Sequence, residues 1–144
     1  MKLMKFGKRV ESVPYLEDVL EVLLAFIVAW IFYQGLAFAA GTPMPIVSVV
    51  SESMEPMLHR GDLVFVVAPR DLQVNDVVIY QREGSAFTII HRIIEKREDG
   101  YIIKGDNNPR PDSGVVKQSQ INGKVLFAVP LLGYPRLALY AVGI

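Results

Sequence analysis

Residues 19–40 read VLEVLLAFIVAWIFYQGLAFAA, and this stretch decides the architecture of the chain. After Glu21 it carries no charge, and Gln34 is its only strongly polar side chain. As a helix it would extend about 33 Å, close to the roughly 30 Å hydrocarbon core of a bilayer. A helix that is apolar on every face has little to bury itself against in a chain of 144 residues. We therefore predict a transmembrane helix over 19–40, with the lipid bilayer as a partner.

The segments on either side of this stretch predict its orientation. Residues 1–18 form a basic lead-in, whereas residues 41–53 contain one acidic side chain and no base. The positive-inside rule then places the N-terminus in the cytoplasm and everything after residue 41 outside. Ala37-Phe38-Ala39 has the small-x-small form of a cleavage site, but the apolar run is longer than the 7–15-residue apolar core of a cleaved leader. We therefore expect a retained, single-pass anchor.

Composition excludes several classes of function. The net charge is zero and no basic stripe is present, so nucleic acid is not an expected partner. The chain has no cysteine, which excludes disulfides, thiol catalysis and cysteine-ligated metal. Its only histidines are His59 and His91, too few for a multi-histidine metal site. We expect neither a metal nor another cofactor.

The chain beyond the span has the pattern of a β domain. After a linker at 41–45, short runs rich in Val, Ile and aromatic residues alternate with turn residues, and the predicted strands are 46–51, 63–67, 77–80, 87–94, 101–104 and 124–129. Asp99-Gly100 predicts a hairpin with a type I′ turn. The fold class is therefore mainly β: a small antiparallel barrel or sandwich over 41–130, tethered by the N-terminal helix.

The tail, residues 131–144, is apolar but is interrupted by Gly133 and Pro135. Arg136 together with Tyr134 and Tyr140 suits the boundary between lipid and water. We predict a membrane-interface segment, with a partial second span as the alternative.

Two serines stand at the exit of the first predicted strand, in the stretch VVSESMEPMLHRGD over 49–62. A nucleophilic serine needs a base within hydrogen-bond reach and donors for the oxyanion. A serine at a strand exit has an exposed hydroxyl and a backbone N–H outside the ladder. By strand alternation Ser51 and Ser53 face the same side, so that one could attack while the other donates. The residues alone do not choose between them, and both also suit an ordinary turn.

The candidate bases are the two histidines. His91 lies within an apolar strand, FTIIHRII, where a half-buried structural histidine would also fit, and His59 lies in a polar turn beside Arg60. A histidine base needs an acid that sets its tautomer. Asp106 and Asp112 both lie in the polar loop 106–119, although an Asp followed by Asn-Asn can equally form a turn.

These residues fall into a series of motifs that resembles type I signal peptidase, in the archaeal and endoplasmic-reticulum branch that has histidine where the bacterial branch has lysine. The motifs occur in the family's order between about residues 19 and 130, and they are Ser51-x-Ser53-Met54-Glu55-Pro56, Arg60-Gly61-Asp62, Ile90-His91-Arg92 and Lys104-Gly105-Asp106-Asn107-Asn108, with Asp112 beyond.

The resemblance implies a role for each matching residue. Ser53, directly before Met54, would be the nucleophile, and Ser51 would join the Ser53 backbone N–H in the oxyanion hole. His91 would be the general base, Asp112 the acid that orients it, and Asp106 a supporting acid. The implied substrate is the signal peptide of a preprotein, with small residues at −3 and −1, added as a strand beside a pocket walled by Val49 and Val50. The secretion translocon would be a further partner.

The resemblance also implies a location, with the catalytic domain outside the cell membrane or, in a eukaryote, in the endoplasmic-reticulum lumen. One residue departs from the family's pattern, because Glu52 stands where glycine is usual, and this affects the expected backbone path. Two other interpretations remain. One is a self-cleaving peptidase of the LexA type, which uses a lysine base. The other is a membrane-anchored β binding module whose serines are structural.

Overall fold

The computed structural model describes residues 15–143, which separate into two units, one ending at Gly35 and one starting at Leu36. Helix α1 (Leu16–Ala40) forms the described part of the first unit and continues to residue 40 of the second, and none of its 25 residues is buried. At 1.5 Å per residue it extends about 38 Å. The helix expected at 19–40 is therefore present and begins three residues earlier. Within the described residues it is the one helix long and apolar enough to cross a membrane.

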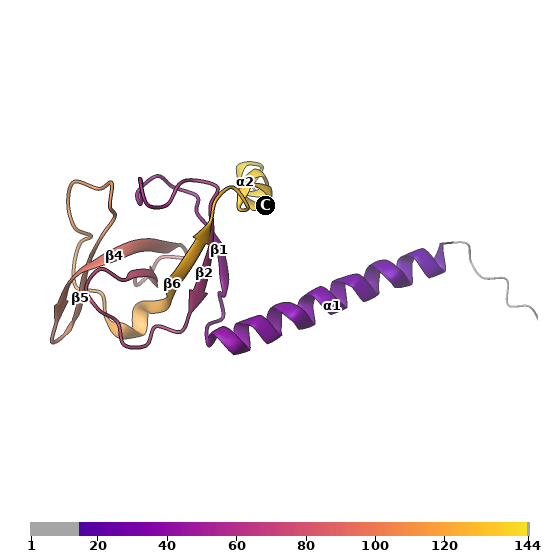
Figure 1. The fold of residues 1–144 in the computed structure, drawn as a ribbon, viewed down its shortest axis with the longest axis horizontal. Coiled ribbons are helices and arrows are strands. Elements are labelled where there is room, and N and C mark those ends of the chain that lie inside the picture. The colour runs from indigo at the N-terminus through magenta and orange to yellow at the C-terminus, as the bar shows by residue number, and fades with distance from the viewer. Residues whose placement is uncertain (1–14, 144) are drawn as a thin grey trace, which may run out of the picture. The chain divides into compact units, whose positions relative to one another are not determined.

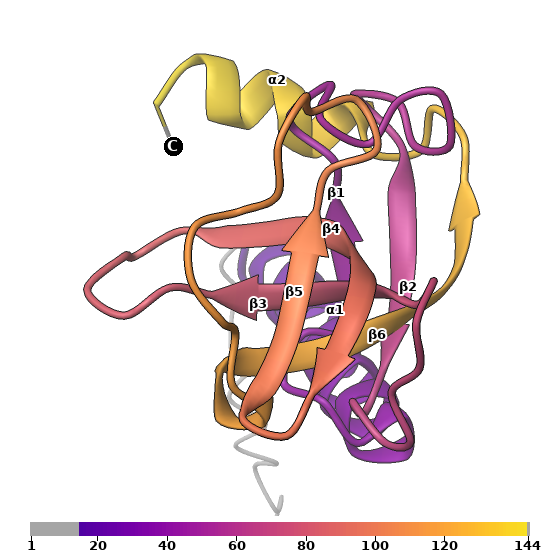
Figure 2. The same cartoon turned by 90° about the vertical axis from the view of Figure 1, so that its left-hand side faces the viewer.

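The second unit is built on six strands: β1 (Ile46–Ser48), β2 (Leu63–Val67), β3 (Val77–Gln81), β4 (Thr88–Arg97), β5 (Gly100–Lys104) and β6 (Ile121–Val129). They form one antiparallel sheet in the order β1-β2-β6-β3-β4-β5. The sheet coils strongly, so that β4 and β5 curve across the other strands (Figures 1 and 2). The predicted class, mainly antiparallel β, is confirmed. The architecture is a single coiled sheet whose edge strands are β1 and β5.

Strand β3 is buried on both faces and divides the core into two clusters. Its continuous apolar sequence allows this, because alternate side chains point to opposite faces. Val78 and Tyr80 join one cluster, which also contains Leu72, Ile93, Tyr101, Ile103, Val116 and Ile121. Val77 and Ile79 join the other, which also contains Val49, Met54, Leu58, Val64 and Val66. Register shifts in the β2–β6, β3–β6 and β4–β5 pairings help to bend the sheet around these clusters.

Two local expectations were wrong. The strand predicted at 46–51 ends at Ser48, because Val49 instead pairs with the following turn: its N–H donates to the Asp62 carbonyl at 2.9 Å and its carbonyl accepts from the Gly61 N–H at 2.9 Å. The β4–β5 hairpin is present, but the residues between the paired Arg97 and Gly100 are 98 and 99. Of the turn residues only Gly100 has a positive φ, 148°, so the turn is not type I′.

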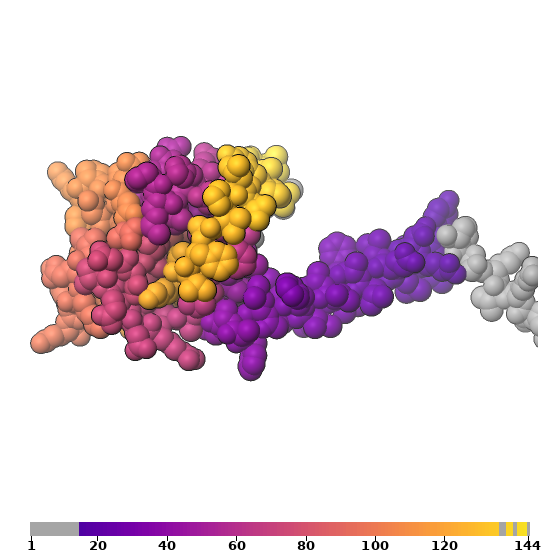
Figure 3. All heavy atoms as spheres, in the orientation of Figure 1, coloured from indigo at the N-terminus to yellow at the C-terminus, as the bar shows by residue number. Residues whose placement is uncertain are grey.

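The chain continues after β6 into helix α2 (Tyr134–Ala141). Its eight residues extend about 12 Å, less than half of a bilayer core. The Gly133 N–H donates to the Gly61 carbonyl at 2.8 Å, and a Cβ at Gly61 would lie 2.5 Å from the Tyr134 ring. Figure 3 shows this C-terminal segment against the chain that follows β1. The side chains of Arg136 and Tyr140 lie outside the described residues, so the membrane-interface location stays a prediction.

Candidate active site

The segment that carries the two serines is a loop fixed by buried apolar side chains. Met54 and Leu58 are each only 1% exposed, and the Leu58 N–H donates to the Met54 carbonyl at 3.0 Å. These anchors pull one side of the loop into the core, while Ser51 stays exposed and Ser53 is half-buried. The two hydroxyls lie 3.1 Å apart, as expected, although no strand holds them there.

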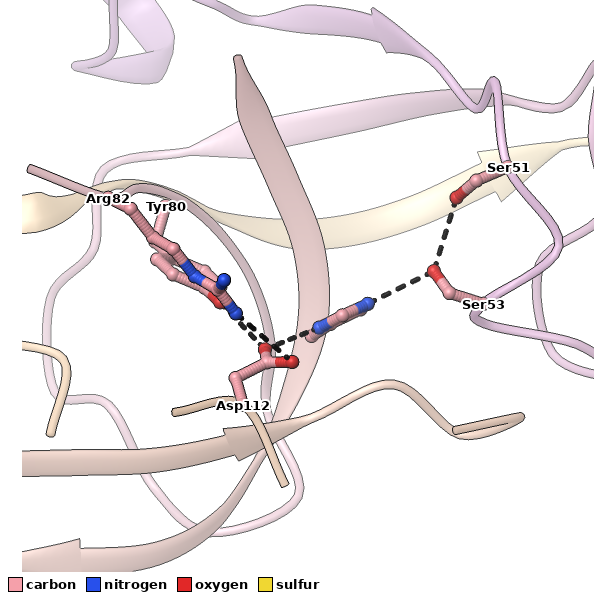
Figure 4. A network of polar contacts seen from close by, with 6 residues as sticks. Ser51, Ser53, Tyr80, Arg82 and Asp112 are labelled. Atoms are coloured by element: carbon pink, nitrogen blue, oxygen red, sulfur yellow. Dashed lines mark hydrogen bonds and ion pairs between the residues drawn. The ribbon is translucent and has the colours of Figure 1, made fainter. Parts of the chain in front are cut away.

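Ser53, His91 and Asp112 form a continuous chain of polar contacts (Figure 4). The Ser53 Oγ lies 3.0 Å from the His91 Nε2, and the His91 Nδ1 lies 2.5 Å from the Asp112 Oδ2. The side chains of His91 and Asp112 are 7% and 8% exposed. A hydroxyl, an imidazole and a carboxylate in this order are the arrangement in which the imidazole can take a proton from the serine.

The other histidine is not part of this chain. The side chain of His59 is 60% exposed, and its Nδ1 lies 4.0 Å from the Asp62 carboxylate within the same turn. The Asp62 carboxylate instead accepts the His59 backbone N–H at 2.8 Å. The structure thus places one of the two histidines against a serine and leaves the other in a solvated turn.

Two partners of Asp112 were missed by the sequence analysis. The Tyr80 hydroxyl donates to the Asp112 Oδ2 at 2.6 Å, and an Arg82 Nη2 lies 3.6 Å from the Asp112 Oδ1 (Figure 4). A nearly buried carboxylate needs such partners to remain charged. Strand period puts residues 80 and 82 on one side of the chain. No sequence signal, however, says that the loop 106–119 returns to that side.

Tyr80 remains a hydrogen-bond donor throughout the neutral and moderately alkaline range. Burial, and then the hydrogen bond to Asp112, raise the pKa of Tyr80 from 10.0 to about 12. Ionisation would bring a phenolate beside the Asp112 carboxylate, so the folded state holds the proton more tightly than the unfolded state. The stabilisation is complete below pH 10 and is lost as the pH rises towards 12.

Tyr80→Phe should therefore lower the free energy of unfolding by about 2 kcal/mol at pH 8, the contribution of a hydrogen bond to a charged group. Between pH 10 and pH 12 the difference from the parent chain should shrink, because only the parent then loses the Tyr80 contribution. Urea titrations of both chains at pH 8 and at pH 11 measure this. A difference that is the same at both pH values would contradict the assignment.

Asp106 does not touch Ser53 or His91. Its carboxylate accepts two hydrogen bonds from Arg92, at 2.8 Å from Nε and 2.6 Å from Nη2, and these bonds raise the pKa of Arg92. The same guanidinium donates to the Asn75 carbonyl at 2.8 Å. Asp106 thus joins its turn to the strand that carries His91, as a supporting group rather than as the partner of the imidazole.

Gly105 lets this turn approach the site. A Cβ at this position would lie 2.7 Å from the Ser53 carbonyl oxygen and 2.8 Å from the His91 Nε2. Both distances are shorter than real contacts allow, so a larger residue would displace the serine or the imidazole. The glycine of the Gly-Asp-Asn-Asn motif is explained by this close approach.

The residues beside the serines differ in their exposure. Val49 is 3% exposed and packs into the core, whereas Val50 is 40% exposed. Of the two predicted pocket walls, only Val50 is therefore exposed at the surface. Glu52 is exposed, and it is not among the described residues with positive φ. The glutamate therefore fits the local backbone path without strain.

The described residues contain no group of three or more His, Asp or Glu side chains arranged to hold a metal ion. Within residues 15–143, the Ser53 N–H donates no hydrogen bond to a backbone or side-chain acceptor. Together with the Ser51 hydroxyl, it is a candidate donor to an oxyanion.

Comparison with known proteins places the chain in a family. Residues 10–126 match the family described as Peptidase S24-like. The chain is also 37% identical, over 133 residues, to the signal peptidase complex catalytic subunit SEC11 of Saccharomyces cerevisiae strains YJM789, RM11-1a and JAY291. The alignment covers 83% of this chain and 80% of each relative. The chain therefore belongs to the Peptidase S24-like family, as a type I signal peptidase of the archaeal and endoplasmic-reticulum branch.

Proposed function

We propose that this chain is a membrane-bound serine endopeptidase that removes signal peptides from secreted preproteins, cleaving after small residues at −3 and −1. The observation that carries the proposal is the contact chain from the Ser53 Oγ through His91 to Asp112, at 3.0 Å and 2.5 Å, in a member of a peptidase family. Similarity to a signal peptidase catalytic subunit supports the choice of substrate.

The proposed mechanism uses the contacts of this site. The His91 Nδ1–H donates to Asp112, which leaves Nε2 free to accept the Ser53 proton. Ser53 then attacks the scissile carbonyl, while its own N–H and the Ser51 hydroxyl stabilise the oxyanion. The imidazolium, stabilised by Asp112, donates its proton to the leaving amine. Water, deprotonated by the same imidazole, hydrolyses the acyl-enzyme and releases the carboxyl end of the signal peptide.

The substrate would lie as an extended strand beside residues 50–53, of which 50–52 are exposed and Ser53 is half-buried. Such binding takes its affinity from main-chain hydrogen bonds and its specificity from pockets for alternate side chains, in accord with a preference at −1 and −3. Val50 is the side chain of this segment best placed to contact the peptide, since it is 40% exposed.

The membrane anchor supports the same function. α1 is apolar and 25 residues long, and the basic residues before it predict a cytoplasmic N-terminus. The anchor would hold the peptidase domain beside the membrane face at which signal peptides end, so that tethering raises the local concentration of substrate. The relatives are catalytic subunits of a complex, and we propose that this chain acts in a comparable assembly near the translocon.

The proposal is tested by incubating the full chain, in detergent, with a purified preprotein and measuring product masses. We expect two products, whose masses locate one cleaved bond after a residue such as alanine, with another small residue at −3. Replacing the −1 alanine of the substrate by a large residue should reduce cleavage at least tenfold, because the proposed site accepts only a small side chain at −1. An unchanged preprotein, or cleavage indifferent to the −1 residue, would reject the proposal.

The two competing interpretations are weakened by the same observations. A binding module with structural serines gives no reason for the contacts of His91 with both Ser53 and Asp112. A LexA-type self-cleaving peptidase uses a lysine base, and here the residue in contact with Ser53 is a histidine.

A further inference from the structure

We propose that Asn107 is a positioning residue that aims the Ser53 N–H into the oxyanion hole. Asn107 lies in the Gly-Asp-Asn-Asn motif, but the resemblance gave it no role of its own. Its side chain donates from Nδ2 to the Glu52 carbonyl at 3.1 Å, across 55 residues of sequence. The inference rests on the proposed function, since it concerns the same site.

The argument begins with the peptide group that joins Glu52 to Ser53. This planar unit contains both the Glu52 carbonyl and the Ser53 N–H. Within the described residues the only cis peptide bond is Glu55-Pro56, so the group is trans and its carbonyl and N–H point in opposite directions. A donor that holds the Glu52 carbonyl on one side therefore directs the Ser53 N–H to the other.

Asn107 also holds the peptide group that follows Ser53. Its backbone N–H donates to the Ser53 carbonyl at 2.9 Å. The two peptide planes that flank the nucleophile are thus bound by a single residue, by its side chain on one side and its main chain on the other. Because a residue's φ and ψ describe the relative rotation of its two flanking planes, both bonds together fix the backbone of Ser53.

Asn107 is itself held against the strand that carries the base. The neighbouring Asp106 makes two hydrogen bonds to Arg92, which follows His91 directly in β4. The turn that carries Asp106 and Asn107 is therefore bonded both to the backbone around Ser53 and to the strand of His91. It holds these two parts of the site at a fixed relative position. The chain needs such a support, because Ser53 belongs to no strand or helix and, among the described residues, its own N–H has no acceptor that would orient it.

The side chain at position 52 also restricts rotation of the Glu52–Ser53 peptide group. Rotation of the Glu52–Ser53 peptide group requires a change in the ψ of residue 52, and a residue with a Cβ has fewer allowed values than glycine. The Glu55 N–H, at 3.2 Å from the same Glu52 oxygen, is a second donor from within the loop. Loss of Asn107 should thus loosen the oxyanion hole rather than abolish it.

The test compares Asn107→Ala and Asn107→Asp with the parent chain. Asn107→Asp keeps the shape and the backbone bond to Ser53 but replaces the Nδ2 donor with an oxygen that repels the Glu52 carbonyl. Removing an oxyanion donor costs about 10²- to 10³-fold in kcat, so misaligning one should cost about 10- to 30-fold. KM should change by less than about threefold, since the oxyanion exists only in the transition state. A peptide aldehyde, which forms a tetrahedral adduct with the serine, should lose affinity in parallel with kcat.

A matched control is Gln118→Ala. Gln118 also donates from a side-chain amide to a distant carbonyl, that of Pro69 at 2.8 Å, and should affect thermal stability without affecting kcat. The proposal is overturned if Asn107→Asp retains kcat within twofold, if its loss lies in KM, or if the aldehyde binds as tightly as before. Ser53→Ala, assayed alongside, separates this failure from that of the proposed function, because it must lose nearly all activity if the proposed function is correct.

Discussion

Ser53→Ala should lose at least about 10⁴-fold in kcat against a preprotein, with little change in substrate affinity. The substitution removes the single oxygen that lies 3.0 Å from the His91 Nε2 and leaves the loop anchors Met54 and Leu58 in the core. Without a nucleophile, only the oxyanion donors and substrate positioning remain. The measurement is the rate of signal-peptide release in detergent, followed over hours so that slow residual cleavage can be quantified.

Two comparisons make the Ser53 result specific. His91→Ala should fall to a similar level, and the double variant should be no slower than either single variant, because the two residues act as a unit. Ser51→Ala should keep the nucleophile and lose about 10²-fold as a missing oxyanion donor. Full activity in Ser53→Ala, or a greater loss in Ser51→Ala than in Ser53→Ala, would exclude Ser53 as the nucleophile.

Asp112→Asn should reduce kcat by about 10⁴-fold, the second largest effect we expect. The amide keeps the size of the side chain but can donate to the His91 Nδ1, which favours the tautomer with the proton on Nε2. That nitrogen could then no longer accept the Ser53 proton. Tyr80 and Arg82 would at the same time lose the charge that they contact. The measurement is kcat at several pH values, together with a melting temperature.

Asp106→Asn is the matched control for Asp112→Asn, because both replace a carboxylate of the same loop by an amide. Asp106 contacts Arg92 and not the imidazole, so this variant should lose about tenfold at most in kcat and should mainly lower thermal stability. Equal losses of kcat in the two variants, at equal stability, would leave the choice of Asp112 as the orienting acid unsupported.

The sequence alone predicted those parts of the fold that rest on local patterns. The apolar stretch at 19–40 and the alternating strands carry their own periodicity, and all six strands were found within three residues of their ends. The strand at 46–51 was overextended, because Val49 and Val50 have a high β propensity while the actual limit is set by a contact with the distant turn at Gly61 and Asp62. The prediction of a type I′ turn was wrong for a similar reason. The strand register pairs Gly100 with Arg97, so the glycine lies one position beyond the two turn residues.

The residues of the site could be predicted where they belong to motifs that resemble those of a known family. Ser53, His91 and Asp112 were chosen by resemblance, and the structure brings the three together. Tyr80 and Arg82 were not predicted, because a tyrosine at the end of an apolar strand usually only packs. Asn107 was part of a quoted motif, but its bonds to residues 52 and 53 depend on how a turn docks onto a loop. Such docking leaves no periodic trace in a sequence.

The position of β6 has a consequence for the moment at which the enzyme becomes competent. β6 is the last strand to be synthesised, yet in the sheet it lies between β2 and β3. Ser53 lies between the two strands on one side of it, whereas His91 and Asp112 belong to the strands and loop on the other side. Until residues 121–129 have been made and paired, no strand pairing joins the nucleophile's part of the sheet to the part that holds its base. We therefore expect a nascent chain that lacks residues 121–129 to be inactive, and hydrolysis to require the complete sheet.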